Sequence, residues 1–232
     1  QLFRGKVAPV AEHPESVPYL YLTPPRRASP RWYLEGIAVF LDTWMAGGQG
    51  RAQGAFDEMV FRIGLWLVTG GSRQQWLAVH RKHHTYTDRE GDPHSPLLLG
   101  FWKVLLGNVY YYVKEARNPR TVATFAPDLG PDKWERRVFS WGWTGLFAGI
   151  GITALFIGWW QAIVAMLIHA VLFVLVLSPL INGLGHWAGA QNFRNTAYNS
   201  RALAWLTGGE SLHNNHHAFP RSPKFSLRWF EL

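Results

Sequence analysis

Six of the ten histidines fall in two copies of one pattern, in which a histidine is followed three and four residues later by two more. The copies occupy residues 80–84, His-Arg-Lys-His-His, and residues 213–217, His-Asn-Asn-His-His. On an α-helix, positions i, i+3 and i+4 share one face, so each copy would bring three imidazoles into one small volume. Neutral imidazole is a good ligand for iron, copper, nickel and zinc. One such triplet could be hydrogen-bonded side chains without a chemical role, but its repetition favours a metal centre.

The number and type of candidate ligands narrow the kind of metal centre. The sequence has no cysteine, so a metal must be held by His, Asp, Glu, Asn or backbone oxygen. Six imidazoles exceed the four ligands of a structural zinc site, which favours two metal ions or one crowded site. For redox chemistry, iron is the better assignment, because zinc does not change its oxidation state.

Other classes of metal centre find little support. Zinc peptidases use His-Glu-x-x-His and zinc deaminases use a pair of cysteines, and the sequence has neither. Soluble carboxylate-bridged di-iron bundles need two Glu-x-x-His pairs, whereas only Glu210 with His213 has that spacing. Both classes are therefore disfavoured.

The remaining histidines differ in their surroundings. His186 follows Asn182 by four residues at the end of an apolar run, so the two are expected on one helical face. Polar groups at such a position are costly enough to suggest a function. His169 lies alone in the middle of that run and is expected to be a packed, hydrogen-bonded side chain rather than a ligand. His94 lies in a turn, which favours support of the ligands over ligation. His13, in a proline-rich arm, is expected to be solvated.

Residues 139–193 contain no Asp, Glu, Lys or Arg, although the chain carries a net charge of +8. The basic residues lie only in the flanks of this stretch and are not distributed as a nucleic-acid binder requires, which argues against that class. The uncharged stretch is about twice the roughly 20 residues of one membrane span. We therefore predict two spanning helices, residues 139–160 and 161–181, joined as an antiparallel hairpin. Basic residues on both flanks predict that the hairpin ends and the histidines face the cytoplasm.

The rest of the chain divides into two parts. Residues 1–55 mix prolines, glycines and charges without a sustained period, which predicts an irregular N-terminal segment. Residues 56–232 are expected to form one domain, with helices through both triplets and an amphipathic segment near residues 101–112 on the membrane surface. The predicted fold class is all-α: an integral membrane helical protein with a transmembrane hairpin, about residues 139–187, and a cytosolic helical cap carrying the histidine motifs.

Three motifs together resemble a known family. The first triplet is followed by Asp-Pro-His-Ser-Pro at residues 92–96, the apolar run ends in Asn-Gly-Leu-Gly-His at 182–186, and the second triplet lies within Gly-Gly-Glu-Ser-Leu-His-Asn-Asn-His-His-Ala-Phe-Pro at 208–220. In order and spacing these motifs resemble the membrane-bound acyl-CoA and acyl-lipid Δ9 fatty acid desaturases, over roughly residues 60–230.

The resemblance implies a ligand set for two iron ions and a water-mediated contact from Asn182. The implied ligands are His80, His83, His84, His186, His213, His216 and His217. The family pattern also has an earlier His-x-x-x-x-His motif, but no histidine lies between His13 and His80. Residues 40–48 stand in its place, so the N-terminal segment is expected to be truncated or degenerate. Asp42 or Asp57 could supply oxygen ligands, although their spacing gives no reason to expect it.

The resemblance also implies an activity. Family members use O2 and iron to remove two hydrogens from adjacent methylenes of a long acyl chain, carried by coenzyme A or a lipid, leaving a cis double bond. Electrons would come from a separate cytochrome b5-like or ferredoxin-like donor and its reductase. Trp76, Phe101 and Trp102 are candidates for the lining of the substrate channel. Two alternatives stay open: an acyl-chain hydroxylase on the same scaffold, and a non-catalytic or truncated relative that only binds metal.

Overall fold

The computed structural model describes residues 51–130, 132–220, 225–228 and 231, apart from the side chains of residues 51–58 and 60. Its regular elements within these residues are all helical, and the only strand-like features there are two isolated bridges, Ala190 to Asn199 and Asn199 to Leu212. The predicted all-α class is therefore confirmed for the described part of the chain.

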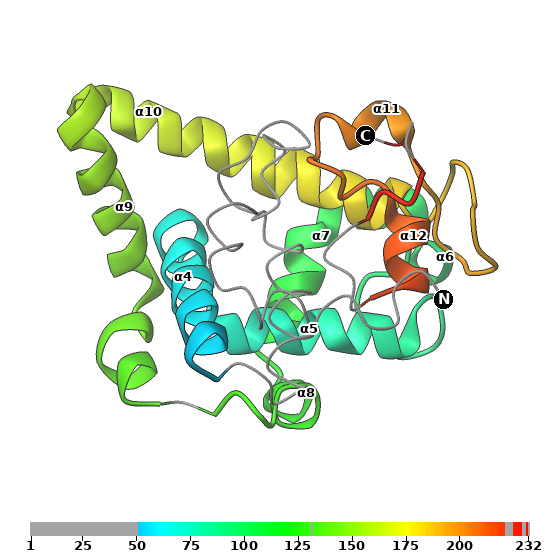
Figure 1. Ribbon diagram of the computed structural model, residues 1–232, viewed down its shortest axis with the longest axis horizontal. Helices are drawn as coiled ribbons and strands as arrows, with labels where there is room; N and C mark the ends of the chain where they lie inside the picture. Colours follow the sequence, from blue (N-terminus) through cyan, green and yellow to red (C-terminus); the bar gives the residue numbers. More distant parts are fainter. Residues whose placement is uncertain (1–50, 131, 221–224, 229–230, 232) are drawn as a thin grey trace.

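The described chain starts with two helices, α4 (Arg51–Thr69) and α5 (Arg73–Tyr86), which run in different directions in Figure 1. A turn at Gly70, with φ +66°, separates them. The Gly70 carbonyl oxygen lies so close to Gly142 that a Cβ added to Gly142 would be 2.1 Å from this oxygen. Apolar side chains of α4 and α5 share a core with the segment that follows α8; its buried members are Phe61, Leu65, Leu77, Ala78, Ala126 and Leu129. This core fixes the first histidine triplet in place.

Three helices follow α5: α6 (Pro96–Leu99), α7 (Phe101–Ala116) and α8 (Pro119–Phe125). On α7, Val104 and Asn108 are buried, whereas Trp102, Leu106 and Tyr110, spaced four residues apart, are at least 64% exposed. The helix thus has the two faces that the sequence predicts for residues 101–112. Contact of its exposed apolar face with a membrane surface stays a prediction.

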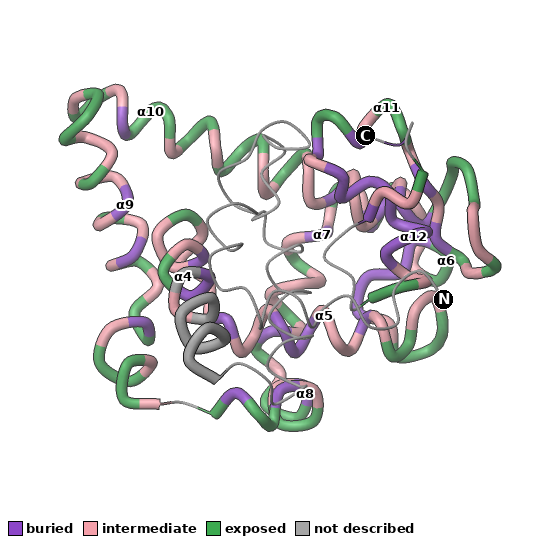
Figure 2. The backbone as a smooth tube through the Cα atoms, viewed as in Figure 1, coloured by how far each residue is buried: buried purple, intermediate pink, exposed green. Residues whose placement is uncertain are grey.

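A short π-helical turn, η1 (Glu135–Phe139), leads into α9 (Gly142–Ile157), which packs along α4. After Gly158 the chain continues as one long helix through α10 (Trp159–His169), η2 (Ala170–Leu177) and η3 (Leu180–Leu184), the last two π-helical. Figure 2 shows that most of this long helix is exposed or intermediate.

Among the described helices, only Trp159–Leu184 is both long and apolar enough to cross a membrane. Its 26 residues extend roughly 39 Å, against a hydrocarbon layer of about 30 Å. The preceding α9 is apolar but has 16 residues, about 24 Å, so it is shorter than a usual span. A helix thus occupies the second predicted span with shifted ends, whereas its crossing of a membrane and its pairing with a first span stay predictions.

The C-terminal part folds back over the end of the long helix. It contains two short helices, α11 (Arg201–Ala204) and α12 (His213–Ala218), joined by turns and the two isolated bridges. In Figure 1, α12 lies beside the end of the long helix, with α5 below it. These three segments surround the site described next.

Candidate metal centre

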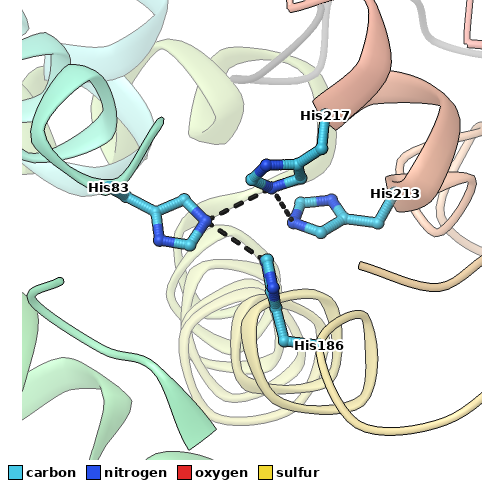
Figure 3. Close-up of side chains that lie close together, drawn as sticks. All are labelled: His83, His186, His213 and His217. Carbon is cyan, nitrogen blue, oxygen red and sulfur yellow. Dashed lines mark hydrogen bonds between the residues drawn. The ribbon is translucent and has the colours of Figure 1, made fainter. Parts of the chain in front are cut away.

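Three separate segments bring the seven predicted ligands together. The first triplet lies on α5, the second lies on α12, and His186 lies in the turn that follows η3. Figure 3 shows His83, His186, His213 and His217 turned toward a common centre from these segments. The structure thus brings the seven side chains together, and their binding of metal stays a prediction.

The seven imidazoles form two adjoining sets, within each of which one nitrogen of every ring lies within 4.8 Å of the others. The four-histidine set contains His83, His186, His213 and His217, and the three-histidine set contains His80, His84 and His216. Each triplet gives its i and i+4 histidines to one set and its i+3 histidine to the other. The first triplet gives its i+3 histidine to the four-histidine set, whereas the second gives its i+3 histidine to the three-histidine set. Both sets therefore contain ligands from both triplets.

Nitrogen atoms within each set approach one another closely. The Nε2 atom of His83 lies 3.2 Å from that of His186 and 3.3 Å from that of His217, which in turn lies 3.1 Å from that of His213. In the other set, the Nε2 atoms of His84 and His216 are 2.9 Å apart. Two imidazoles bound to one ion, at about 2.1 Å each and near a right angle, have their nitrogens about 3 Å apart.

Burial keeps these rings in the form that binds metals. Burial and neighbouring histidines lower the pKa of His80, His83, His213, His216 and His217 well below its usual value. The same two effects, burial first, lower the pKa of His84 to about 4. At neutral pH these rings are therefore uncharged, and each has one nitrogen with a free lone pair.

Two aspartates orient rings of the four-histidine set. Asp92 accepts a hydrogen bond from Nδ1 of His83 (3.0 Å), and Asp88 accepts one from Nδ1 of His186 (2.8 Å). Asp92 is itself fixed by the backbone N–H groups of Asp88 and His94, and the Ser95 hydroxyl donates to Asp88 at 2.6 Å. Since an ionised carboxylate only accepts, Nδ1 of each ring carries a proton, and the neutral form of each ring therefore presents its Nε2 lone pair to the centre.

These tautomers show that the site fits a metal. When both rings are neutral, the Nε2 lone pairs of His83 and His186 face each other at 3.2 Å and cannot hydrogen-bond to each other. A cation between them would turn this repulsion into two coordinate bonds. The donor set of neutral imidazoles with carboxylates behind them is also the usual one for protein-bound iron or zinc.

A cavity of about 100 Å³ adjoins the histidines. Its walls include His80 and His83 on one side and the end of the long helix on the other; the other lining residues are Trp76, Val79, His94, Asn108, Tyr112, Phe173, Ser178, Ile181, Asn182 and Glu210. Among the channel candidates, Trp76 lines the cavity and stacks on His80, with ring centroids 4.9 Å apart. Phe101 and Trp102 are not among the lining residues, and Trp102 is 68% exposed.

The structure places the other predicted residues as follows. Asn182 lines the cavity and donates to the Asn108 amide oxygen (3.1 Å). His94 is buried and stacks on His83 with 4.5 Å between centroids, in agreement with a supporting position. His169 stacks on Phe173 within the long helix. His13 and residues 40–48, with Asp42, lie outside the described residues, as does the side chain of Asp57.

Sequence reasoning assigned no role to Asp88, Asp92 or Asn108. Asp92 belongs to the turn motif that carried the family resemblance, so its position beside the first triplet was a usable signal. Asp88 has φ +56°, a left-handed conformation that no sequence period indicates. Asn108 lies within the amphipathic segment predicted near residues 101–112, where nothing in the sequence distinguishes it from a solvent-facing polar residue.

Comparison with known proteins gives a consistent result. The family model described as "Fatty acid desaturase" matches residues 46–232. The sn-1 stearoyl-lipid 9-desaturase of Anabaena variabilis is 28% identical over 221 residues, which cover 87% of this chain and 77% of that protein. The Delta-9 acyl-lipid desaturase 2 of Arabidopsis thaliana is 34% identical over 72% of this chain, and the hex-5-enoyl-[acyl-carrier protein] acetylenase of Moorena producens is 31% identical over 68%.

Two of these matches cover only about half of the relative's own length. The chain spans 54% of the length of both the Arabidopsis and the Moorena proteins. No solved structure matches the chain.

Proposed function

The chain belongs to the fatty acid desaturase family, and we propose that it is an oxidoreductase that inserts a cis double bond into a long acyl chain, with O2 and two iron ions. The observation that carries this proposal is the pair of histidine sets, in each of which one nitrogen of every ring lies within 4.8 Å of the others.

Each histidine set would hold one iron ion. The four-histidine set would bind one ion through Nε2 atoms whose tautomers Asp88 and Asp92 fix, and His80, His84 and His216 would bind the other. Bound iron would supply the O2 activation that amino-acid side chains lack. The protein contributes fixed ligand geometry and exclusion of water from the buried centre.

The cavity beside the histidines suits part of an acyl chain. Trp76, Val79, Phe173 and Ile181 give it apolar walls next to His80 and His83. Asn182 and Asn108 place amides at the same wall, where the family pattern implies a water between Asn182 and the metal. Phe101 and Trp102 remain candidates for a more distant part of the channel.

The long helix gives the proposed substrate a route to the site. Desaturases of this family are associated with membranes, and Trp159–Leu184 ends directly before the metal-binding turn. We infer that this helix and α9 form the membrane hairpin and that the histidines lie at its cytoplasmic end, since basic residues flank the apolar stretch on both sides.

The proposal also includes the carrier of the acyl chain and the electron donor. The relatives are named for acyl-lipid, acyl-CoA and acyl-carrier-protein substrates, so the acyl chain could be presented in any of these forms. A separate cytochrome b5-like or ferredoxin-like donor with its reductase would supply electrons.

Product analysis tests the proposal. The full chain is expressed in a host that supplies a desaturase electron donor, and total fatty acids are analysed by gas chromatography with mass spectrometry. New cis-monoenes that disappear in His83→Ala support desaturation. Hydroxylated chains would instead support the hydroxylase alternative. Iron-loaded protein without either product would favour a relative that only binds metal, an alternative suggested by the lack of the earlier histidine motif.

A further inference from the structure

Asn215 on α12 lies between two of the proposed ligands and uses its whole hydrogen-bonding capacity. Its Oδ1 accepts from Nδ2 of Asn192 (2.8 Å) and of Asn199 (2.9 Å). Its Nδ2 donates to the Phe225 carbonyl oxygen (2.9 Å) and to Oε2 of Glu231 (3.1 Å). Because a carbonyl and a carboxylate only accept, the orientation of this amide is fixed. The side chain is 2% exposed, so water does not replace these partners.

Glu231 is an equally buried carboxylate, 2% exposed. Besides Asn215, it accepts hydrogen bonds from Nδ2 of Asn192 (2.6 Å) and from the backbone N–H groups of Leu227 (2.7 Å) and Arg228 (3.0 Å). Burial alone would raise the pKa of Glu231, but these bonds outweigh burial and hold the pKa below its usual value. Burial of a carboxylate is unfavourable unless such bonds replace its hydration. The Glu231 carboxylate thus links the C-terminal residues Leu227 and Arg228 to Asn192 and Asn215.

The same C-terminal residues touch a proposed ligand directly. The Phe225 ring lies against the His216 ring, with centroids 4.6 Å apart. Its carbonyl is the one that accepts from Asn215, so one residue contacts α12 through both its side chain and its backbone. The C-terminal residues 225–228 and 231 therefore cover α12 beside the three-histidine set.

The helix α12 depends on such contacts for its orientation. It has six residues, far fewer than a helix needs to be stable in isolation, and no side chain caps its N-terminus. The adjacent Asn214 bonds to the chain segment before α11, where its Oδ1 accepts from the Asn192 and Phe193 N–H groups. On the C-terminal side, the carboxylate of Glu231 is the charged anchor.

We propose that Glu231 is a positioning residue for the metal centre: through Asn215 it fixes the helix that carries three of the seven ligands. The consequence for metal binding rests on the proposed function, whereas the consequence for the order of α12 does not. Without the carboxylate, Nδ2 of Asn215 and Nδ2 of Asn192 each lose one acceptor inside the protein. The three histidines of α12 are then no longer held in the positions at which they complete the two histidine sets.

Hydrogen exchange of the metal-free full chain in detergent tests the structural part. Glu231→Ala is expected to increase the exchange rate of peptides covering residues 213–219 at least tenfold, with little change in α4. The control is Asp132→Ala, which removes the carboxylate that binds Arg62 of α4 (2.8 Å) and is not among the partners of α12 named above. Unchanged exchange at 213–219 in Glu231→Ala, or the same increase there in the control, would overturn the proposal.

Titration with Co²⁺ tests the metal-binding part, because its absorption spectrum reports ligand number. Glu231→Ala is expected to weaken Co²⁺ binding about 10- to 100-fold, the usual effect of losing a residue behind metal ligands. Glu231→Gln keeps one acceptor oxygen and should lose less, and Asp132→Ala should stay within twofold of the unchanged chain. Equal Co²⁺ affinity in Glu231→Ala would contradict the inference. An unchanged chain that takes up no Co²⁺ would refute the proposed function, while hydrogen exchange still decides the role of Glu231.

Discussion

The Nε2 atoms of His83 and His186 lie 3.2 Å apart, while the opposite nitrogen of each ring is bonded to its own aspartate. When both rings are neutral, the two aspartates place each proton on Nδ1, so two lone pairs face each other and no hydrogen bond forms between the rings. The arrangement becomes favourable when a cation lies between the rings. The aspartates are therefore as much a part of the proposed centre as the histidines.

Loss of an orienting aspartate should weaken metal binding without removing a ligand. Asp88→Ala leaves Nδ1 of His186 without its carboxylate, and we expect about 10- to 100-fold weaker Co²⁺ binding. Asp128→Ala is the control, since Asp128 pairs with Arg81 at the protein surface. Competitive titration against a chelator measures both. Equal affinities of the two variants would mean that Asp88 does not support the ligand.

Because α9 packs closely against α4, replacing Gly145 by a larger residue should destabilise the protein. A Cβ on Gly145 would lie 2.2 Å from the Trp66 carbonyl oxygen, whereas a Cβ on Gly151 would meet nothing within 4 Å. Gly145→Ala is expected to destabilise the protein by about 1–3 kcal/mol, and Gly151→Ala to leave it unchanged or slightly more stable. Thermal unfolding in detergent compares the two. A Gly145→Ala protein as stable as Gly151→Ala would contradict the described packing of α9.

The ion pair between Arg62 and Asp132 should give a pH-dependent contribution to stability. Hydrogen bonding from Arg62 holds the pKa of Asp132 below its usual value despite some burial. A depressed pKa in the folded state stabilises above the unfolded value of about 4, and this stabilisation is lost as the pH falls further. Asp132 is 43% exposed, so we expect only about 1 kcal/mol, or about 2–4 °C in unfolding midpoint.

The comparison uses Asp132→Asn against the unchanged chain. The variant should unfold at lower temperature near pH 7, and the gap between the two should shrink below about pH 4. A gap that is constant from pH 7 to pH 3 would show that the carboxylate charge is not what stabilises this region.

Filling the cavity should reduce turnover and leave the metals in place. Ile181 lines the cavity, whereas Ile163 is 47% exposed on the outer surface of α10. Ile181→Phe is expected to lower formation of unsaturated product at least tenfold, while Ile163→Phe keeps it near the original level. Fatty acid analysis and metal content are measured together on both variants. Full activity of Ile181→Phe would exclude this cavity as part of the acyl path.

Much of the site followed from the sequence because helical spacing fixed it. The positions of His80, His83 and His84 on one helix, and the repeat of that spacing at residues 213–217, were enough to predict a shared metal centre. The division of each triplet between two sets was not predicted. It depends on how α5 and α12 approach each other, which no local period encodes.

Two details depended on departures from regular geometry. The spacing of Asn182 and His186 suggested one helical face, but π-helical η3 ends at Leu184 and His186 lies in the following turn. Asn182 therefore faces the cavity, whereas His186 joins the four-histidine set. Likewise, the apolar stretch of residues 139–193 indicated membrane spans, but Gly158, with φ +91°, set a boundary that leaves α9 at 16 residues.

Elemental analysis of the detergent-purified chain tests the central claim most directly, with His213→Ala and His80→Ala as one variant for each histidine set. The account predicts about two irons per chain, with each variant retaining about one and the double variant retaining none. One iron or none in the unchanged chain would contradict the claim that these seven histidines form two metal sites.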